Sequence, residues 1–246
     1  MSVLSLQLAG PLQSWGATAR FARRTTEVAP TKSGVLGLLA AAMGLDREDE
    51  TGLAELAELR FGVRIDQPGT PLRDFHTAHH FDTGEAMPLS ERHYLADAVF
   101  VAAVEGPAFL IDRLHAAVRA PVYLPYLGRR SCPPSRALEL GAHHNAPDLH
   151  TVLAAEPWHA AEWHQRRLRH LANVRLAAHL DAPTGVGQAL DGDALRDQPL
   201  SFAARHRRYA LRTVHTTSIT VTNPHARLRE IAAVPAHDPI GHLEGA

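Results

Sequence analysis

A helix start that carries a lysine is the first place in the sequence where chemistry could occur. Residues 30–34 read PTKSG and precede an apolar run, so Thr31 or Ser33 would cap a helix. A phosphate-binding P-loop needs a glycine directly before its lysine, whereas Thr31 precedes Lys32, the chain's only lysine. We expect either free N–H groups at residues 32–35 that can hold an anion, or an ordinary capped helix.

A second candidate is the loop of residues 123–132, which reads YLPYLGRRSC. Arg129 and Arg130 follow Gly128, and Tyr126 lies close by in the sequence. Guanidinium groups bind phosphates and tyrosine rings stack on bases, so the combination suits a single-stranded nucleic acid. The alternative is a surface loop with one buried tyrosine.

Histidines are numerous, at 17, but they form no recognised metal motif. HTAHH at 76–80 and GAHHN at 141–145 lack the acid spacing of a zinc protease, and Cys132 is the only cysteine. We therefore predict no metal and no cofactor. A metal-independent ribonuclease could still use His76 as a base with Tyr126 and Lys32, and this reading stays open.

The charges are segregated along a chain whose formal net charge is −1. Three stretches contain arginines and no acid, namely 1–26, 113–138 and 201–229, while acids concentrate at 46–58. This segregation allows a basic groove on a neutral protein. The alternative is that the arginines scatter over the folded surface.

The composition is that of a globular protein with one large core or two small ones, at 246 residues and 45% hydrophobic. A single cysteine suits a reducing compartment. No stretch approaches the roughly 20 apolar residues that cross a bilayer, and the first residues lack a basic leader. We expect a cytoplasmic protein with no membrane contact.

Periodicity predicts the elements that position these candidates. Residues 2–10 alternate as a half-buried strand, residues 33–43 and 46–59 are typical of helices, and residues 60–66 are typical of a strand. A polar excursion at 70–94 precedes a strand at 94–106, a helix at 107–120, a proline-rich loop at 121–135 and a short strand near Leu138. This order predicts an α+β fold with the βαββαβ succession of a ferredoxin-like sheet.

The last third of the chain has weaker patterns. Residues 157–172 favour a helix, residues 173–183 a strand, and residues 208–222 one or two strands rich in β-branched side chains. Prolines after residue 221 indicate a loose tail.

Several of these motifs together resemble the CasD family of subunits of Cascade, the type I-E CRISPR surveillance complex. They are LAGPLQSWG, PTKSGVLGLLAAAMGLDR, LRDFHTA, YLADAVFVAAVEG and PYLGRRSCPPS, in that order, with a fainter match in RDQPLSFAARHRRYALRTV. The resemblance implies an RRM-like RAMP domain over residues 1–140 with a β-hairpin thumb inserted at about 70–94. Residues 141–246 would form a small β-rich C-terminal subdomain and tail.

The resemblance also implies a function, which is to grip the 5′ repeat-derived handle of the crRNA without catalysis. Partners would be the CasC backbone, the large subunit CasA, indirectly CasB and CasE, and target DNA in the assembled complex. His76 and Arg92 of the thumb would lie between a nucleotide and CasC. The RNA-binding residues implied overall are Gln13, Trp15, Arg23, Arg24, Thr31, Lys32, Ser33, Gly34, His76, Arg92, Tyr126, Gly128, Arg129, Arg130 and Ser131.

Two alternatives remain at this point. In a related type I-C system the corresponding subunit is the processing nuclease, so a metal-independent endoribonuclease that cuts CRISPR repeat RNA is the main one. The other is a purely structural subunit whose arginines meet acidic protein surfaces.

Overall fold

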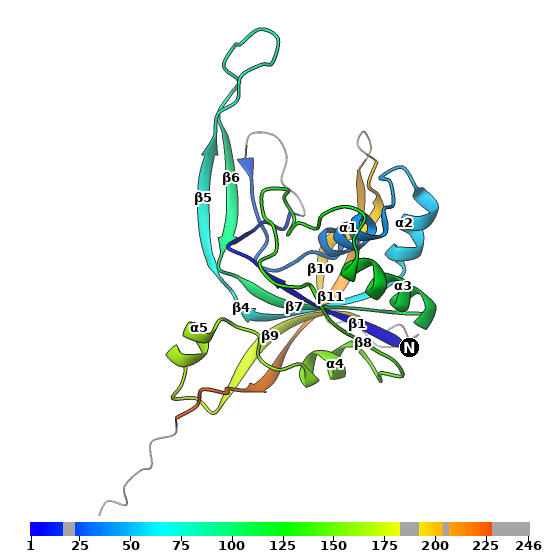
Figure 1. The fold of residues 1–246 in the computed structure, drawn as a ribbon, viewed down its shortest axis with the longest axis vertical. Coiled ribbons are helices and arrows are strands. Elements are labelled where there is room, and N and C mark those ends of the chain that lie inside the picture. The colour runs from blue at the N-terminus through cyan, green and yellow to red at the C-terminus, as the bar shows by residue number, and fades with distance from the viewer. Residues whose placement is uncertain (17–22, 183–191, 204–206, 228–246) are drawn as a thin grey trace, which may run out of the picture.

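The computed structural model describes residues 1–16, 23–182, 192–203 and 207–227 (Figure 1). The main sheet has seven strands in the order β10-β11-β9-β4-β7-β1-β8, and all neighbours are antiparallel. Its strands are β1 (Ser2–Ala9), β4 (Arg60–Gln67), β7 (Val99–Gly106), β8 (Glu139–His143), β9 (Asn173–Asp181), β10 (Asp193–Ser201) and β11 (Arg208–Thr222).

Helices cover both faces of this sheet (Figure 1). They are α1 (Lys32–Met43), α2 (Glu50–Ala57), α3 (Ala108–Arg119), α4 (Leu149–Ala155) and α5 (Glu162–Arg167). The first three lie on one face, which we call the α1 face, and the last two lie on the other, which we call the α5 face. No helix in the described ranges is long and apolar enough to cross a membrane.

The predicted βαββαβ succession is present as β1, α1, β4, β7, α3 and β8, so the α+β prediction is confirmed. Residue 140, the expected boundary of the C-terminal part, lies within β8. Strands β9 to β11 continue the same sheet, because β9 pairs with β4 through residues 62–64.

The prediction of a half-buried first strand is wrong, since β1 is buried on both faces. Leu4, Leu6 and Leu8 contact the helices of the α1 face. Val3 belongs to a second apolar cluster with Leu149 and Leu153 of α4, on the other face. A strand covered on both faces keeps even its polar side chains out of water, and the alternation in the sequence therefore misled the burial prediction.

The excursion expected at 70–94 is a hairpin that projects from the body (Figure 1). Its strands are β5 (Thr70–His76) and β6 (Ser90–Ala96), and we call residues 70–96 the thumb hairpin. The single strand expected at 94–106 is divided, because Asp97 has a φ of 56° and separates β6 from β7. Residues 94–96 therefore belong to the thumb hairpin.

Two short strands dock on the thumb hairpin and form a second sheet with it. They are β2 (Leu12–Gln13), antiparallel to β6, and β3 (Arg23–Arg24), parallel to β6. The segment between β1 and α1, for which periodicity predicts no element, thus contains the two strands that hold the base of the thumb.

The helix expected at 157–172 is much shorter, since α5 covers only residues 162–167. Its end is fixed from a distant part of the chain, because the Asn223 side chain donates to the carbonyls of Gln165 and Leu168 at 3.1 and 3.0 Å. Carbonyls at a helix end need such partners, and Asn223 supplies them just after β11. The tail expected after residue 221 lies outside the described residues from 228 onward.

Candidate nucleic-acid interface

Four separate segments meet at the base of the thumb hairpin. The Ser14 backbone N–H donates to the Leu127 carbonyl at 3.1 Å, and its hydroxyl donates to the His93 carbonyl at 3.0 Å. The first bond joins the loop of residues 10–16 to the loop of residues 126–132, and the second joins it to β6. We call the surface formed by Arg24, Arg92 and residues 126–131 the thumb-base face.

Gly128 allows the closest of these approaches. Its φ is +84°, and a Cβ built on it would lie 1.8 Å from the Ser14 carbonyl oxygen. Neither the backbone angle nor the space suits any other residue. Gly128 therefore allows the loop that carries Arg129 and Arg130 to pack directly against the Ser14 backbone.

Arg129 is held on the thumb-base face by two contacts. Its guanidinium lies 4.7 Å from the ring centroid of Tyr94, and Nη2 donates to the Arg24 carbonyl at 2.8 Å. A cation held over an aromatic ring keeps its planar fork in a fixed orientation. Tyr94 was not predicted from the sequence as part of this site. Its position two residues before the end of the thumb hairpin is the feature of the sequence that could have indicated it.

Two guanidinium nitrogens beside this contact are buried and have no hydrogen-bond partner among the described residues. They are Arg92 Nε and Arg129 Nη1, and Arg92 lies on the same side of β6 as Tyr94 because side chains alternate along a strand. The His93 side chain points to the other side of β6, where its Nε2 lies 3.9 Å from Glu91 Oε2. An unpaired buried donor costs about 1–3 kcal/mol, so natural structures rarely leave several together. Two such donors beside one aromatic ring suit a ligand rich in acceptors.

Arg130, Gly128 and Ser131 are exposed beside Arg129, and Tyr126 is half-buried. Arg24 is exposed and stands opposite Arg92 in the register of β3 and β6. The structure therefore brings these predicted residues together with Arg92. For Arg23 it describes the backbone, opposite Glu91, and its side chain lies outside the described residues.

His76 lies on β5, where its Nε2 is 2.9 Å from Asp74 Oδ2. It stands opposite Ser90, at the far end of β6 from Tyr94. The structure thus places His76 on the thumb hairpin as expected, and away from the thumb-base face.

The helix start at residues 30–34 is already occupied by groups of the chain itself. Thr31 is the N-cap, and its hydroxyl accepts from the Gly34 N–H at 3.2 Å. The Lys32 N–H donates to Asp197 Oδ2 at 2.7 Å, and the Val35 N–H donates to the Thr31 carbonyl. Of the two alternatives, the capped helix is confirmed, and the N–H groups of residues 32, 34 and 35 are not free, since a carboxylate 165 residues away takes the position of the anion at Lys32.

Lys32 is also committed to the interior, with 5% of its surface exposed. Its Nζ donates to Asp181 Oδ2 at 3.1 Å, and Arg212 binds both Asp181 and Asp197 at 2.5 Å. Burial lowers the pKa of Lys32, although the Asp181 charge opposes this. Burial alone would also lower the pKa of Arg212, but the hydrogen bond and charge of Asp197 outweigh it and raise that pKa.

Four charged side chains thus form a buried network, namely Lys32, Asp181, Asp197 and Arg212. The network corrects the prediction that the arginines of residues 201–229 contribute to a basic groove, at least for Arg212. Arg212 counts toward that stretch in the sequence, yet it faces the interior with 9% of its side chain exposed. Thr31 and Ser33 are buried as well, at 1% and 6%.

Gln13 and Trp15 lie beneath the thumb-base face, and both are fully buried. The Trp15 indole donates to Gln13 Oε1 at 3.0 Å, and Gln13 Nε2 donates to the carbonyls of Leu8 and Ala98 at 3.0 and 2.8 Å. Gly34 faces the same indole, because a Cβ there would lie 2.8 Å from Trp15 Cε3. These three residues connect the thumb base to α1.

The residues of the ribonuclease reading are not joined to one another. Among the described residues no hydrogen bond or ion pair links any two of His76, Tyr126 and Lys32. In the same ranges no group of three or more histidine, cysteine and acidic side chains has a metal-binding arrangement.

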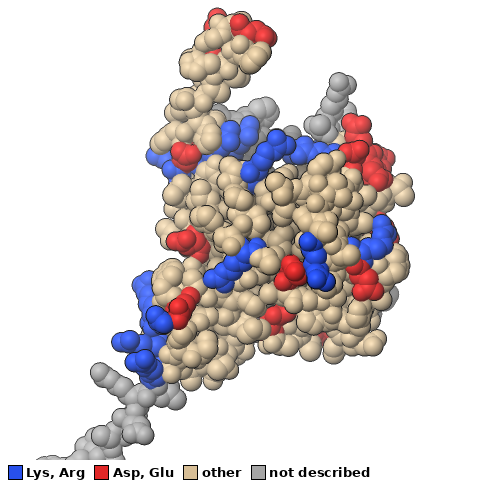
Figure 2. All heavy atoms as spheres, viewed as in Figure 1, with Lys and Arg blue, Asp and Glu red and all other residues tan. Residues whose placement is uncertain are grey.

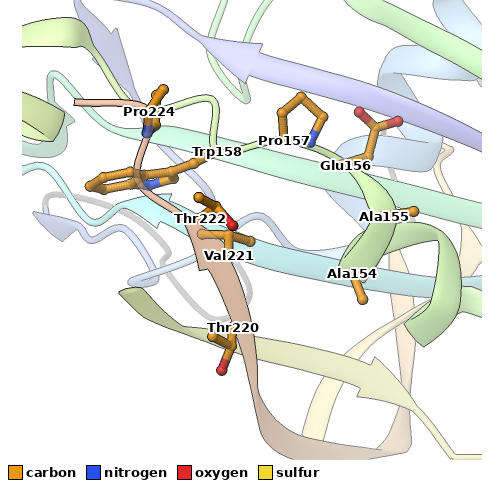
Figure 3. Close-up of a pocket in the computed structure, with 9 residues that line it drawn as sticks. All are labelled: Ala154, Ala155, Glu156, Pro157, Trp158, Thr220, Val221, Thr222 and Pro224. Carbon is orange, nitrogen blue, oxygen red and sulfur yellow. The ribbon is translucent and has the colours of Figure 1, made fainter. Parts of the chain in front are cut away.

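One cavity, of about 380 Å³, opens on the α5 face between the stretch after α4 and the end of β11 (Figure 3). Its lining residues are Ala154, Ala155, Glu156, Pro157, Trp158, Thr220, Val221, Thr222 and Pro224. Glu156 is its one ionisable side chain, and it accepts from Ser5 Oγ at 2.8 Å and lies 3.3 Å from His159 Nε2. The Glu156 carboxylate is therefore already bound by Ser5 and His159. None of the predicted RNA-binding residues lines the cavity.

The sequence profile of the family described as CRISPR-associated protein (Cas_Cas5) matches residues 3–215. That range contains the thumb hairpin, the loop with Arg129 and nearly all of the main sheet. The chain belongs to the Cas5 family. The resemblance stated from the motifs is thereby confirmed.

Relatives of this Cas5 chain agree with the assignment. It is 38% identical over 175 residues to the CRISPR system Cascade subunit CasD of Escherichia coli (strain K12), over 63% of this chain and 78% of that protein. A chain of a structure described as a CRISPR RNA-guided surveillance complex is 34% identical, with a TM-score of 0.71 over 89% of this chain and 91% of that one. A crystal structure described as a Cas protein is 32% identical, with a TM-score of 0.66 over 92% and 98% of the two chains.

Proposed function

We propose that this Cas5 chain is a non-catalytic RNA-binding subunit of Cascade that holds the 5′ handle of the crRNA on its thumb-base face. The observation that carries the proposal is the pair of buried guanidinium nitrogens on Arg92 and Arg129 that have no hydrogen-bond partner among the described residues, beside the exposed Arg130. Phosphate oxygens are acceptors that can satisfy such donors, and bidentate guanidinium contacts to phosphate are strong. The kinship with the Cascade subunit CasD supports the choice of complex.

Direct RNA contacts are proposed for the accessible residues of this face, namely Arg24, Arg92, Tyr126, Gly128, Arg129, Arg130 and Ser131. Gln13, Trp15, Thr31, Lys32, Ser33 and Gly34 would act beneath them by fixing the thumb base and α1. The thumb hairpin would reach the CasC backbone, since Leu72, Phe75 and Phe81 are exposed at 41%, 51% and 99%. Contacts with CasA and target DNA, indirect ones with CasB and CasE, and a cytoplasmic location stay predictions.

The test replaces Arg129 and Arg130 with alanine in the assembled complex. Each lost phosphate contact to a single strand lowers the salt slope of log K by about 0.7, so the double variant should lose about 1.4 and retain markedly less crRNA. The matched control is Arg113→Ala with Arg119→Ala, which removes the same charge from side chains of α3 that are 53% and 64% exposed. Unchanged crRNA occupancy in the first variant would refute the assignment of this face.

The endoribonuclease alternative needs a separate assay. The purified chain is incubated with repeat hairpin RNA in the presence of a chelator, and the products are resolved on a gel. We expect intact RNA. Cleavage that disappears in a His76→Ala or Tyr126→Phe variant would establish the enzyme instead.

A further inference from the structure

The short helix α5 and the turn after it have no role in the proposed function, yet they carry three exposed arginines, Arg166, Arg167 and Arg169. Figure 2 shows blue side chains gathered at the lower left, where Figure 1 places α5. We call this surface the α5 patch. It consists of Trp163, Arg166, Arg167, Arg169 and Arg227, all of them exposed.

The patch is held in place by main-chain and side-chain bonds rather than by its own charges. The Arg227 N–H donates to the Arg169 carbonyl at 2.7 Å, which brings the two residues together across 58 positions of sequence. Asn223 fixes the end of α5 from the same segment. The arginines therefore project from an ordered surface.

Most of the positive charge on the patch is uncompensated. Residues 162–171 and 223–227 contain four arginines against one acid, Glu162, which lies 2.5 Å from Arg166. Among the described residues Arg167, Arg169 and Arg227 form no ion pair. Burial and the Arg167 charge both lower the pKa of His164, as expected beside excess positive charge.

An exposed aromatic ring accompanies this charge. Trp163 is 54% exposed, whereas the other two tryptophans, Trp15 and Trp158, are 0% and 5% exposed. Residues at i, i+3 and i+4 share one side of a helix, so Trp163 neighbours Arg166 and Arg167. Arginines that bind phosphates beside an aromatic ring that stacks on a base are the usual elements of single-strand binding.

We propose that the α5 patch is a second nucleic-acid site, which binds a single strand of RNA or DNA without sequence preference. The loop that carries Arg129 packs on the α1 face through Leu127 and Cys132, whereas α5 lies on the other face, so the patch is separate from the thumb-base face. A strand would stack a base on Trp163 and place neighbouring phosphates on Arg167, Arg169 and Arg227. One chain could then hold two different strands, or two distant parts of one strand.

The binding experiment uses the full chain carrying Arg129→Ala and Arg130→Ala, so that the thumb-base face contributes little. Fluorescein-labelled dT15 and U15 are titrated across a salt series. Arg167→Ala, Arg169→Ala and Arg227→Ala together should weaken binding at least tenfold at low salt and lower the salt slope by about 2, at 0.7 for each contact. The control is Arg47→Ala with Arg113→Ala and Arg119→Ala, which removes the same charge elsewhere and should change neither quantity.

Tryptophan fluorescence tests stacking separately. A base on Trp163 should quench the one exposed indole, and Trp163→Ala should bind about tenfold more weakly. Trp163→Phe keeps an aromatic face, so it should bind within about threefold of the parent while losing the saturable quenching.

The outcomes separate this proposal from its rivals. Binding of either probe that is weakened by the patch substitutions supports the site, and a preference for dT15 or U15 identifies the strand. Equal affinity and slope in the patch and control variants would overturn it, as would tighter binding of duplex or equal competition by polyglutamate. The same titrations without the Arg129 and Arg130 substitutions show whether the thumb-base face binds RNA, so either proposal can fail alone.

Discussion

Removal of the Asp197 carboxylate should reveal how much of the fold depends on the buried network at the start of α1. Asp197 is fully buried and accepts from Arg212 Nε at 2.5 Å, from Arg212 Nη2 at 3.0 Å and from the Lys32 N–H at 2.7 Å. In Asp197→Ala the Lys32 N–H loses its partner and Arg212 loses two of its bonds.

Breaking a buried ion pair by removing one member costs about 3–5 kcal/mol. Arg212 keeps Asp181 at 2.5 Å, so its charge stays partly compensated and we expect a loss of about 3 kcal/mol. A loss of about 3 kcal/mol raises the unfolding equilibrium constant by roughly a hundredfold. This loss is a large part of the free energy of unfolding of a domain, which is about 5–15 kcal/mol. Asp197→Asn keeps the shape of the side chain and one acceptor oxygen, so its free energy of unfolding should lie between those of the parent and the alanine variant.

Urea unfolding of the full chain, followed by circular dichroism, measures this change as a lower midpoint with an unchanged slope. Asp193→Ala is the matched control, because Asp193 is exposed on the same strand and should change stability by less than about 0.5 kcal/mol. A loss below about 1 kcal/mol in Asp197→Ala, combined with tighter binding of handle RNA, would refute the reasoning. It would mean that the carboxylate only competes with a phosphate for the helix start.

Three further predictions concern single contacts. Gly128→Ala should lower the free energy of unfolding by at least about 2 kcal/mol and reduce crRNA retention, because the φ of Gly128 is +84° and the new Cβ would meet the Ser14 carbonyl. Gly16→Ala is the control, since a Cβ there enters open space, and it should change neither stability nor retention in the same urea and retention assays. Asp148→Ala should cost about 1 kcal/mol at pH 7, since Asp148 caps α4 by accepting from the Thr151 N–H at 2.7 Å. That bond lowers the pKa of Asp148, so the difference from the parent should shrink as the pH falls from about 4 toward the lowered pKa, and a difference constant from pH 7 to 3 would contradict this. Asn223→Ala should cost about 1–3 kcal/mol and speed hydrogen exchange in α5, because two carbonyls lose their donor, while the exposed Asn173→Ala should have little effect on either.

Local patterns in the sequence were sufficient for most elements. The helices at 32–43 and 108–119 and the strands at 173–181 and 208–222 each fall where periodicity predicts them. The thumb hairpin was identified from the absence of periodicity, together with the family resemblance. Such features depend on residues within one element, and the sequence displays them directly.

The chemistry of the helix start could not be predicted in this way. Thr31 was recognised as a cap, but nothing near it in the sequence indicates that Asp197 would fill the space left for an anion. The same applies to Arg212, which has no acid within fifteen positions other than Asp197 itself. Contacts between residues so far apart follow from strand order, and strand order in the C-terminal part had no signal.

The buried network also constrains when the chain can finish folding. Lys32 finds its two partners 149 and 165 residues later, and those partners depend on Arg212 beyond them. During synthesis at about 5–20 residues per second, the first 60 residues wait at least about 8 s before the last of these groups exists. Until then α1 has a lysine and an N–H group that cannot be buried without penalty, so the N-terminal half must stay open or solvated. The last strands of the sheet therefore complete the first helix, and a chain that ends before Arg212 should accumulate as an unfinished intermediate.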